Sequence, residues 1–122
     1  MPTDKIPQVP FGAVYFRKSN PPREDWARDY GVAREDGLNV FRHWFMWAAI
    51  ERKPGVYDWS DYDRQMDLAA ENGIKTVIAE LTHSTPDWAY RKWAHARQIR
   101  MDGHPLPNHM GVSSSSGGFA HN

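Results

Sequence analysis

The chain has 122 residues, enough for one domain of ordinary size, and its 15 basic and 15 acidic side chains cancel. A zero net charge argues against general nucleic-acid binding, and zero cysteines exclude a disulfide scaffold and a thiolate metal site. The six Trp, five Tyr and five Phe favour either an aromatic core or a surface that stacks on flat ligands such as sugar rings.

The first predicted unit is a strand, a helix and a second strand. The apolar run Phe11–Phe16 is typical of a buried strand. Ser19–Pro22 ends this strand and opens a helix, because a small polar cap and a proline in the first turn favour helix starts. Gly37 ends the helix and Leu38–Phe41 forms the second strand. The buried helical stripe is predicted from three-to-four spacing: Trp26, Tyr30, Ala33.

A second unit repeats this order. Ser60 is predicted to cap a helix, with Asp63 completing a variant of the capping box. Gly73 closes the helix, and Ile74–Leu81 is a strongly apolar strand. The predicted buried stripe of this helix is Tyr62, Met66, Ala69 and Ala70.

The segments that connect each helix to the following strand match almost residue for residue in the two units. Glu35–Leu38 corresponds to Glu71–Ile74 at an offset of 36 residues, about one βα unit. Coincidence between two helix ends is the alternative, but the flanking strands also agree. We therefore expect parallel strands joined by right-handed crossovers. Beyond them, Thr85–Asp87 starts a short helix that runs through Trp93, and the chain from Met101 onward is loop.

Arg42 is the first candidate for a functional residue, since it is predicted at the end of the second strand. In parallel α/β barrels the loops at the carboxyl ends of strands carry the chemistry. A guanidinium there can grip a carboxylate or a sugar hydroxyl, or it can pair with a neighbouring glutamate. The aromatic residues that follow either fill the mouth of the barrel or stack on a ring, and packing is favoured for most of them individually: His43, Trp44, Phe45, Trp47.

Several stretches together resemble the family-42 β-galactosidases, a family of barrel glycoside hydrolases. They begin with Gly12–Phe16 and the order Gly-Leu-Asn-Val-Phe-Arg that ends at Arg42. An aromatic turn to Trp47 leads into Ile50-Glu51-x-x-Pro54-Gly55-x-Tyr57-Asp58-Trp59. Further agreement comes from Arg23–Asp29, Ala70–Lys75 and Thr82–Trp88. Each motif is weak by itself, but the set in this order is fairly specific and extends from about Phe11 to Asn122.

The resemblance implies a retaining mechanism on a (β/α)₈ barrel, with one glutamate as acid/base and another as nucleophile. In the family these residues follow the fourth and seventh strands. We count three strands here, so no catalytic residue is assigned. Glu80, near the end of the third strand, is favoured as an ion-pair partner. Glu51 corresponds to a structural turn, and Asp58 is expected to cap or brace the next helix.

The residues carried over are the substrate-binding candidates Arg42, Trp47 and His83. Arg42 matches the family arginine that lines the sugar subsite beside the catalytic pair, whereas Trp47 and His83 are expected on the rim. Some family members bind zinc through cysteines, which are absent here. His104 and His109 lack helical ligand spacing, so neither a metal site nor a cofactor is predicted.

We expect three segments: an extension over 1–10, an incomplete barrel domain over 11–100, and a loop-rich tail over 101–122 that stops before the fourth strand. The predicted function is the N-terminal part of a retaining β-galactosidase, inactive alone. The alternatives are a non-catalytic carbohydrate-binding module and a fragment that completes a barrel with another polypeptide or a second copy, associating through open strand edges. A galactoside is the expected ligand. With no apolar run of signal-peptide or membrane-span length, we expect a soluble, cytoplasmic protein.

Overall fold

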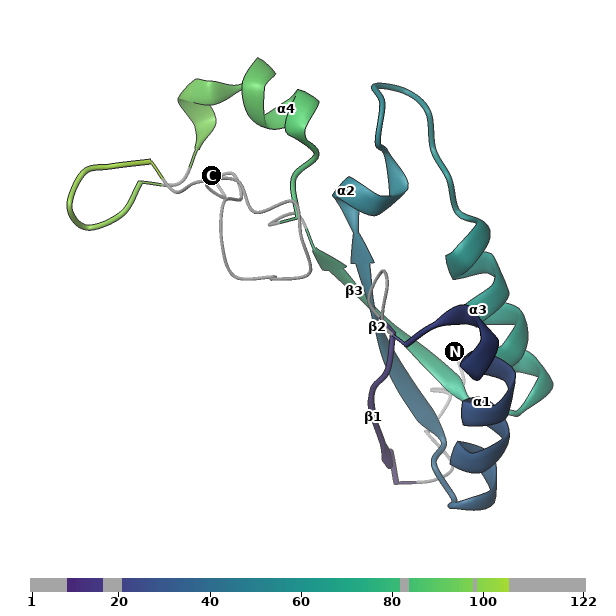
Figure 1. Cartoon of the computed structure of the whole chain (residues 1–122). Helices are drawn as coiled ribbons and strands as arrows, with labels where there is room; N and C mark the ends of the chain where they lie inside the picture. The colour runs from purple at the N-terminus through teal and green to yellow at the C-terminus, as the bar shows by residue number, and fades with distance from the viewer. Residues whose placement is uncertain (1–8, 17–20, 82–83, 98, 106–122) are drawn as a thin grey trace, which may run out of the picture.

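A computed structural model describes residues 9–16, 21–81, 84–97 and 99–105. Three parallel strands form one sheet in the order β1-β2-β3. Helices α1 and α3 follow β1 and β2 and lie together on one face of this sheet (Figure 1). The elements are β1 (Gly12–Val14), η1 (Arg23–Asp25), α1 (Trp26–Glu35), β2 (Val40–Met46), α2 (Trp47–Ile50), α3 (Ser60–Glu71), β3 (Lys75–Leu81), α4 (Asp87–Lys92) and η2 (Ala94–Ala96).

The predicted 36-residue repeat is confirmed by the ends of α1 and α3. Gly37 and Gly73 adopt φ of +82° and +65°, the left-handed conformation that favours glycine. The next residue then bonds back into each helix at the same distance. The Leu38 amide donates to Ala33, and the Ile74 amide donates to Ala69, both at 2.9 Å. The two βα units therefore share one mechanism of chain reversal.

The core lies between the two helices and the sheet and is largely aromatic. Phe41 of β2 stacks on Tyr15 at 4.6 Å and meets Tyr30 of α1 edge-on at 5.1 Å. Tyr62 of α3 contacts Phe16 and stacks on Phe45, with ring centroids 4.3 Å apart in the second pair. The predicted α1 stripe is confirmed as buried: Trp26, Tyr30, Ala33.

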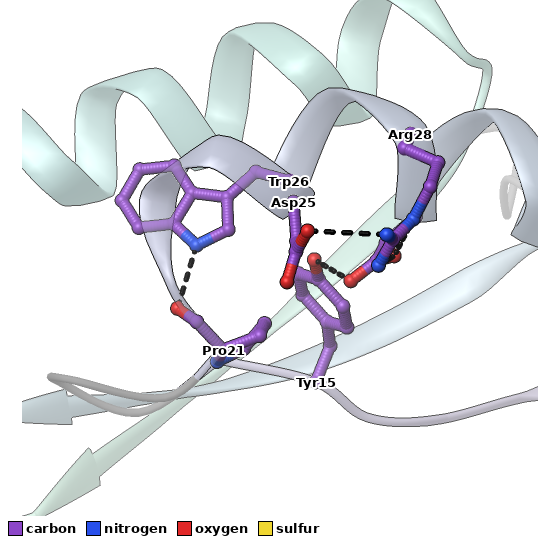
Figure 2. Close-up of polar contacts among 6 residues, drawn as sticks. Tyr15, Pro21, Asp25, Trp26 and Arg28 are labelled. Carbon is purple, nitrogen blue, oxygen red and sulfur yellow. Dashed lines mark hydrogen bonds and ion pairs between the residues drawn. The ribbon is translucent and has the colours of Figure 1, made fainter.

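Polar contacts attach the start of α1 to the end of β1 (Figure 2). The Tyr15 hydroxyl donates to Asp29 at 2.9 Å, and the Trp26 indole donates to the Pro21 carbonyl at 2.8 Å. Arg28 bridges Asp25 at 3.1 Å and Asp29 at 2.8 Å. These bonds fix the direction in which the chain leaves β1 and enters the helix.

The strand predictions need two corrections. The first strand was predicted to be buried over Phe11–Phe16, whereas β1 has three residues and all are exposed, because it forms an edge of the sheet. The second was predicted to end at Phe41, but β2 continues to Met46. The strand extends this far because the side chains of His43 and Phe45 point toward the helices, as that of Phe41 does, and contact aromatic rings there.

Two helix details also differ from prediction. Ser60 is the first helical residue and not a cap; its amide and hydroxyl instead donate to Asp58, at 3.1 and 2.6 Å. Asp58 therefore braces the start of α3, as expected. The predicted buried stripe is rotated, because α3 presents Gln65 and Leu68 to the core and leaves Met66 and Ala70 exposed. The Tyr30 hydroxyl bonds the Gln65 carbonyl at 3.1 Å and fixes this orientation.

The described residues after β3 have the structure that the sequence predicts. The predicted short helix is α4, and an irregular turn closed by the Ile99–Pro105 bridge follows. Residues 106–122, which include His109, lie outside the described residues. The boundaries of the three predicted segments therefore stay predictions.

Candidate functional site

Arg42 lies on the face of the sheet opposite the two covering helices. It is the third of the seven β2 residues, not the strand end that the sequence predicted, and its side chain is exposed. In register beside it are Val14 of β1 and Val77 of β3, both about half exposed. The Arg42 carbonyl accepts from the Tyr15 amide at 3.0 Å, but its guanidinium bonds no other side chain in the described ranges. Such a forked donor is available for oxygen atoms of a ligand.

The segments that follow β2 and β3 lie beyond the carboxyl ends of these strands (Figure 1), and hydrogen bonds join them. The Ala48 amide of α2 donates to the Ser84 carbonyl at 2.7 Å. Trp88 of α4 meets Trp47 of α2 edge-on at 6.0 Å and donates its indole N–H to the Glu51 carbonyl at 2.9 Å. Two loops that are far apart in sequence therefore form one rim.

Glu51 holds this rim together, which confirms the structural role predicted for it. Its carboxylate accepts the Trp47 indole N–H at 2.7 Å and the Gly55 amide at 2.8 Å. These hydrogen bonds lower the pKa of the Glu51 carboxyl below its usual value, and the bond from Gly55 has the largest effect. Gly55 adopts a φ of +75°, so the turn that delivers its amide needs a glycine. Both carboxylate oxygens have partners, which favours a bracing role over proton transfer.

Trp47 and Arg42 are not brought together. The Trp47 ring lines a groove of about 680 Å³, and its indole N–H is bonded to Glu51. The groove contains Ile78 of β3, which pairs with the helix-facing His43, and Arg42 is not part of it. Its lining is mostly apolar: Phe45, Trp47, Ile50, Glu51, Tyr57, Trp59, Ile78.

His43 is fully buried, as the packing interpretation of the aromatic cluster predicted. Its Nε2 lies 3.1 Å from the Tyr30 hydroxyl, and its Nδ1 has no hydrogen-bond partner among the described residues. Burial lowers the pKa of His43 to about 4, so the ring is neutral near pH 7. The alternation of Phe41, His43 and Phe45 at every second residue was the sequence signal for a strand facing a core.

The remaining candidates are only partly described. His83 lies outside the described residues, and Glu80 pairs in register with Phe45 without a described side chain. His104 lies in the exposed turn near Asp102, with Nδ1 3.3 Å from the carboxylate. The roles predicted for His83 and Glu80 stay predictions.

Comparison with known proteins assigns the family. The sequence profile of glycoside hydrolase family 42, described as beta-galactosidase, matches residues 15–112. The chain belongs to this family. Beta-galactosidase LacZ of Heyndrickxia coagulans is 34% identical over 79 residues, which are 64% of this chain and 12% of that protein. Beta-galactosidase Bga of Halorubrum lacusprofundi is 29% identical over 75% of this chain and 13% of its own length.

Solved structures of beta-galactosidases share the fold. The polyextremophilic beta-galactosidase of Halorubrum lacusprofundi superposes with a TM-score of 0.69 at 24% identity, over 88% of this chain and 16% of that one. The Marinomonas ef1 enzyme gives 0.68 at 23% identity, over 77% of this chain and 14% of its own. The predicted fold class, a partial (β/α)₈ barrel of parallel βα units, is confirmed.

The family-42 chain spans less than a sixth of the curated relatives named here, at 12% and 13% of their lengths. Within the described residues, no helix is long and apolar enough to cross a membrane. The expected cytoplasmic location stays a prediction.

Proposed function

We propose that this chain forms the first βα units of a retaining β-galactosidase, in which Arg42 contacts the galactose ring. Family membership supports the substrate class, since the relatives are named beta-galactosidases. The observation that carries the proposal is the exposed guanidinium on the sheet face opposite the helices, which has no partner among the described residues. In a closed barrel that face is the interior, and the active site lies at the end of the barrel where the carboxyl ends of the strands meet.

Arg42 is suited to this contact for a physical reason. Its planar fork donates several N–H bonds in fixed directions, and a sugar ring presents adjacent hydroxyl oxygens as acceptors. Val14 and Val77 lie in register on either side of it and offer no competing polar group. Because no described carboxylate neutralises the guanidinium, its donors are free for a ligand.

The chemistry itself is proposed to depend on residues other than those named here. A retaining glycosidase needs two carboxyl groups about 5–5.5 Å apart on either side of the bond to be cleaved. The family resemblance assigns them to the fourth and seventh strands, and the described part of this chain has three. We therefore expect the chain alone to bind sugar weakly and to hydrolyse none.

We also propose that Trp47 and His83 lie on the rim of the sugar site. Trp47 can offer only its ring, because its indole N–H bonds Glu51. We expect its contribution to be smaller than that of Arg42.

Two measurements test the proposal. Incubation of the purified chain with a chromogenic β-galactoside should give no turnover, and turnover that is sensitive to mutation would show that the catalytic residues are misassigned. Titration with galactose, followed by Trp fluorescence, should give saturable quenching that Arg42→Ala abolishes. Arg34→Ala, at an exposed position on α1, is the matched control and should leave quenching unchanged. Equal quenching in both variants would remove Arg42 from the sugar contact.

A further inference from the structure

We propose that Trp44 is the aromatic residue on which the galactose ring held by Arg42 stacks, and that the Tyr62 hydroxyl holds Trp44 in place. The inference rests on the proposed function, because it adds a second contact to the same sugar. The sequence left the aromatic run after Arg42 open between packing and stacking on a ring. His43 and Phe45 face the helices and pack there, whereas Trp44 between them does not point to that side.

The first argument is the position of Trp44 in β2. Strand side chains alternate, so Trp44 lies on the same face as Arg42 and two residues nearer the carboxyl end of the strand. Two such residues are about 6–7 Å apart, a separation that one pyranose ring bridges. Because active sites of parallel α/β barrels lie at that end, Trp44 stands between Arg42 and the mouth of the barrel. Its register partner is Ala79 of β3, whose methyl group takes up little of the space beside the indole.

The second argument is the chemistry of the surface that Trp44 presents. The residue is partly buried and its indole nitrogen is a buried atom, so the surface that its side chain exposes is carbon. A pyranose ring has an apolar face of C–H groups and carries its hydroxyls around the edge. An aromatic surface packs on the first, and a guanidinium donates to the second. Trp44 and Arg42 together match both chemical properties of a sugar.

The same chemistry favours galactose over glucose. The two sugars differ only in the hydroxyl of the fourth ring carbon, which is axial in galactose and equatorial in glucose. In galactose the hydrogens of the third, fourth and fifth carbons therefore lie toward one face and form a continuous apolar patch. Glucose lacks this patch, because its fourth hydrogen points to the opposite face. Stacking on Trp44 stabilises bound galactose more than bound glucose, so Trp44 is a specificity-determining residue.

The third argument is that the backbone of Trp44 is held on both sides. Its amide donates to the Phe16 carbonyl at 2.8 Å, and its carbonyl accepts the Tyr62 hydroxyl at 2.8 Å. The same hydroxyl accepts the Met46 amide at 3.0 Å. The residues of β1 that pair with β2 end at Val14, so the buried Tyr62 side chain bonds backbone groups that a longer first strand would pair. Tyr62 is therefore a positioning residue that acts from α3.

A plug that keeps ligands away from Arg42 is the other role that this position allows. Arg42 is nevertheless exposed, although Trp44 lies beside it on the same face. Within the described residues the indole does not seal the guanidinium from a ligand. This exposure favours stacking over plugging.

Titration of the nitrogen-15-labelled chain with galactose and with glucose tests the role of Trp44 by NMR. Galactose should shift the indole N–H signal of Trp44, identified as the signal that is missing from the spectrum of Trp44→Leu. Trp44→Leu should raise the Kd for galactose roughly three- to tenfold and that for glucose less, and Trp44→Phe should restore most of the affinity. Trp59→Leu, at an exposed position outside this face, is the matched control and should bind like the unmodified chain.

The outcomes separate this inference from the proposed function. An unchanged galactose Kd in Trp44→Leu, or an unchanged ratio of the two Kd values, would overturn the role of Trp44. Tighter binding by Trp44→Leu would identify the indole as a plug and would also overturn it. If Arg42→Ala abolishes binding and Trp44→Leu does not, the proposed sugar contact stands and only this inference fails. No galactose binding by the folded, unmodified chain would overturn both.

Tyr62→Phe tests the positioning role separately. The variant keeps the ring that stacks on Phe45 and removes only the hydroxyl. We expect faster amide exchange at Met46, a raised galactose Kd and a smaller shift of the Trp44 indole signal on addition of galactose. Tyr15→Phe is the control, because it removes a hydroxyl that bonds α1 at 2.9 Å, and it should leave the galactose Kd unchanged. Equal effects of the two variants would mean that lost stability changes binding, and would overturn the role assigned to Tyr62.

Discussion

The two faces of the sheet differ in what their side chains do. On the helix-covered face, Phe41 and His43 are buried and each contacts several aromatic rings. On the opposite face, Arg42 is exposed between Val14 and Val77. Residues adjacent in sequence thus belong to a packed core and to an open surface, because strand side chains alternate.

This difference separates stability from function. Contacts that hold the described fold together are concentrated between the sheet and α1 and α3. The exposed part of the opposite face, around Val14, Arg42 and Val77, contributes little to packing within the described residues and carries the candidate sugar contact. Substitutions on the first face should therefore change unfolding, whereas those on the second should change binding.

The largest effect is expected for Phe41→Ala. Loss of a buried ring that contacts Tyr15 and Tyr30 should cost about 3–5 kcal/mol, enough to unfold much of a small domain. Arg42→Ala, one position further along β2, should change the free energy of unfolding by less than about 0.5 kcal/mol. Urea denaturation followed by circular dichroism measures both. Similar losses for the two variants would contradict the division between the faces.

A second effect concerns the pH dependence of stability. His43 has a folded pKa of about 4 and an ordinary value of 6.5, so the unfolded chain takes up its proton first. Stability should be complete above pH 6.5 and fall as the pH drops toward 4, by roughly 3 kcal/mol in total. Urea midpoints between pH 7.5 and 5 measure the first part of this loss, about 2 kcal/mol. His43→Gln should flatten the profile, while His95→Gln, at an exposed site, should reproduce it; an equally steep profile in both would exclude His43 as the cause.

The third expectation concerns the contact between β1 and β2. A β-carbon at Gly12 would overlap the Val40 carbonyl oxygen, so Gly12→Ala must push the strands apart. We expect a loss of about 1–3 kcal/mol. The Tyr15 amide, which bonds the Arg42 carbonyl, should then exchange with solvent faster. Unchanged exchange would mean that β1 tolerates the displacement.

The smallest effect has the opposite sign. Gly31 lies inside α1 and has open space around its α-carbon. Gly31→Ala should stabilise the chain by about 0.5–1 kcal/mol through helix propensity alone. A rise in the urea midpoint would confirm this, and a loss would indicate that α1 packs more tightly at Gly31 than the structure indicates.

Local sequence signals predicted much of the fold. Gly37 and Gly73 marked the helix ends, because only a left-handed residue makes the reversal without strain. The stripe of Trp26, Tyr30 and Ala33 was readable from helical spacing. The same method misplaced the stripe of α3, since Gln65 is buried through its contacts with the core and not through its own polarity.

The candidate site was less predictable. Arg42 could be named as a candidate from its position and from the family resemblance. Only the structure shows that the strands place Val14 and Val77 beside it and that its guanidinium has no partner among the described residues. The placement of Trp47 depended on Glu51, which binds its indole and turns it toward the groove. Such contacts join residues through folded loops, so no spacing along the chain reports them.

The amino-acid order alone determined the succession of strand and helix, the points of chain reversal and the family. Each depends on neighbouring residues, whose backbone preferences act over a few positions. The tertiary structure decided which face each side chain occupies, how far β2 extends and which strands form the edges of the described sheet. Those features arise from packing between segments that are distant in the chain, where burial and hydrogen bonding outweigh local preference.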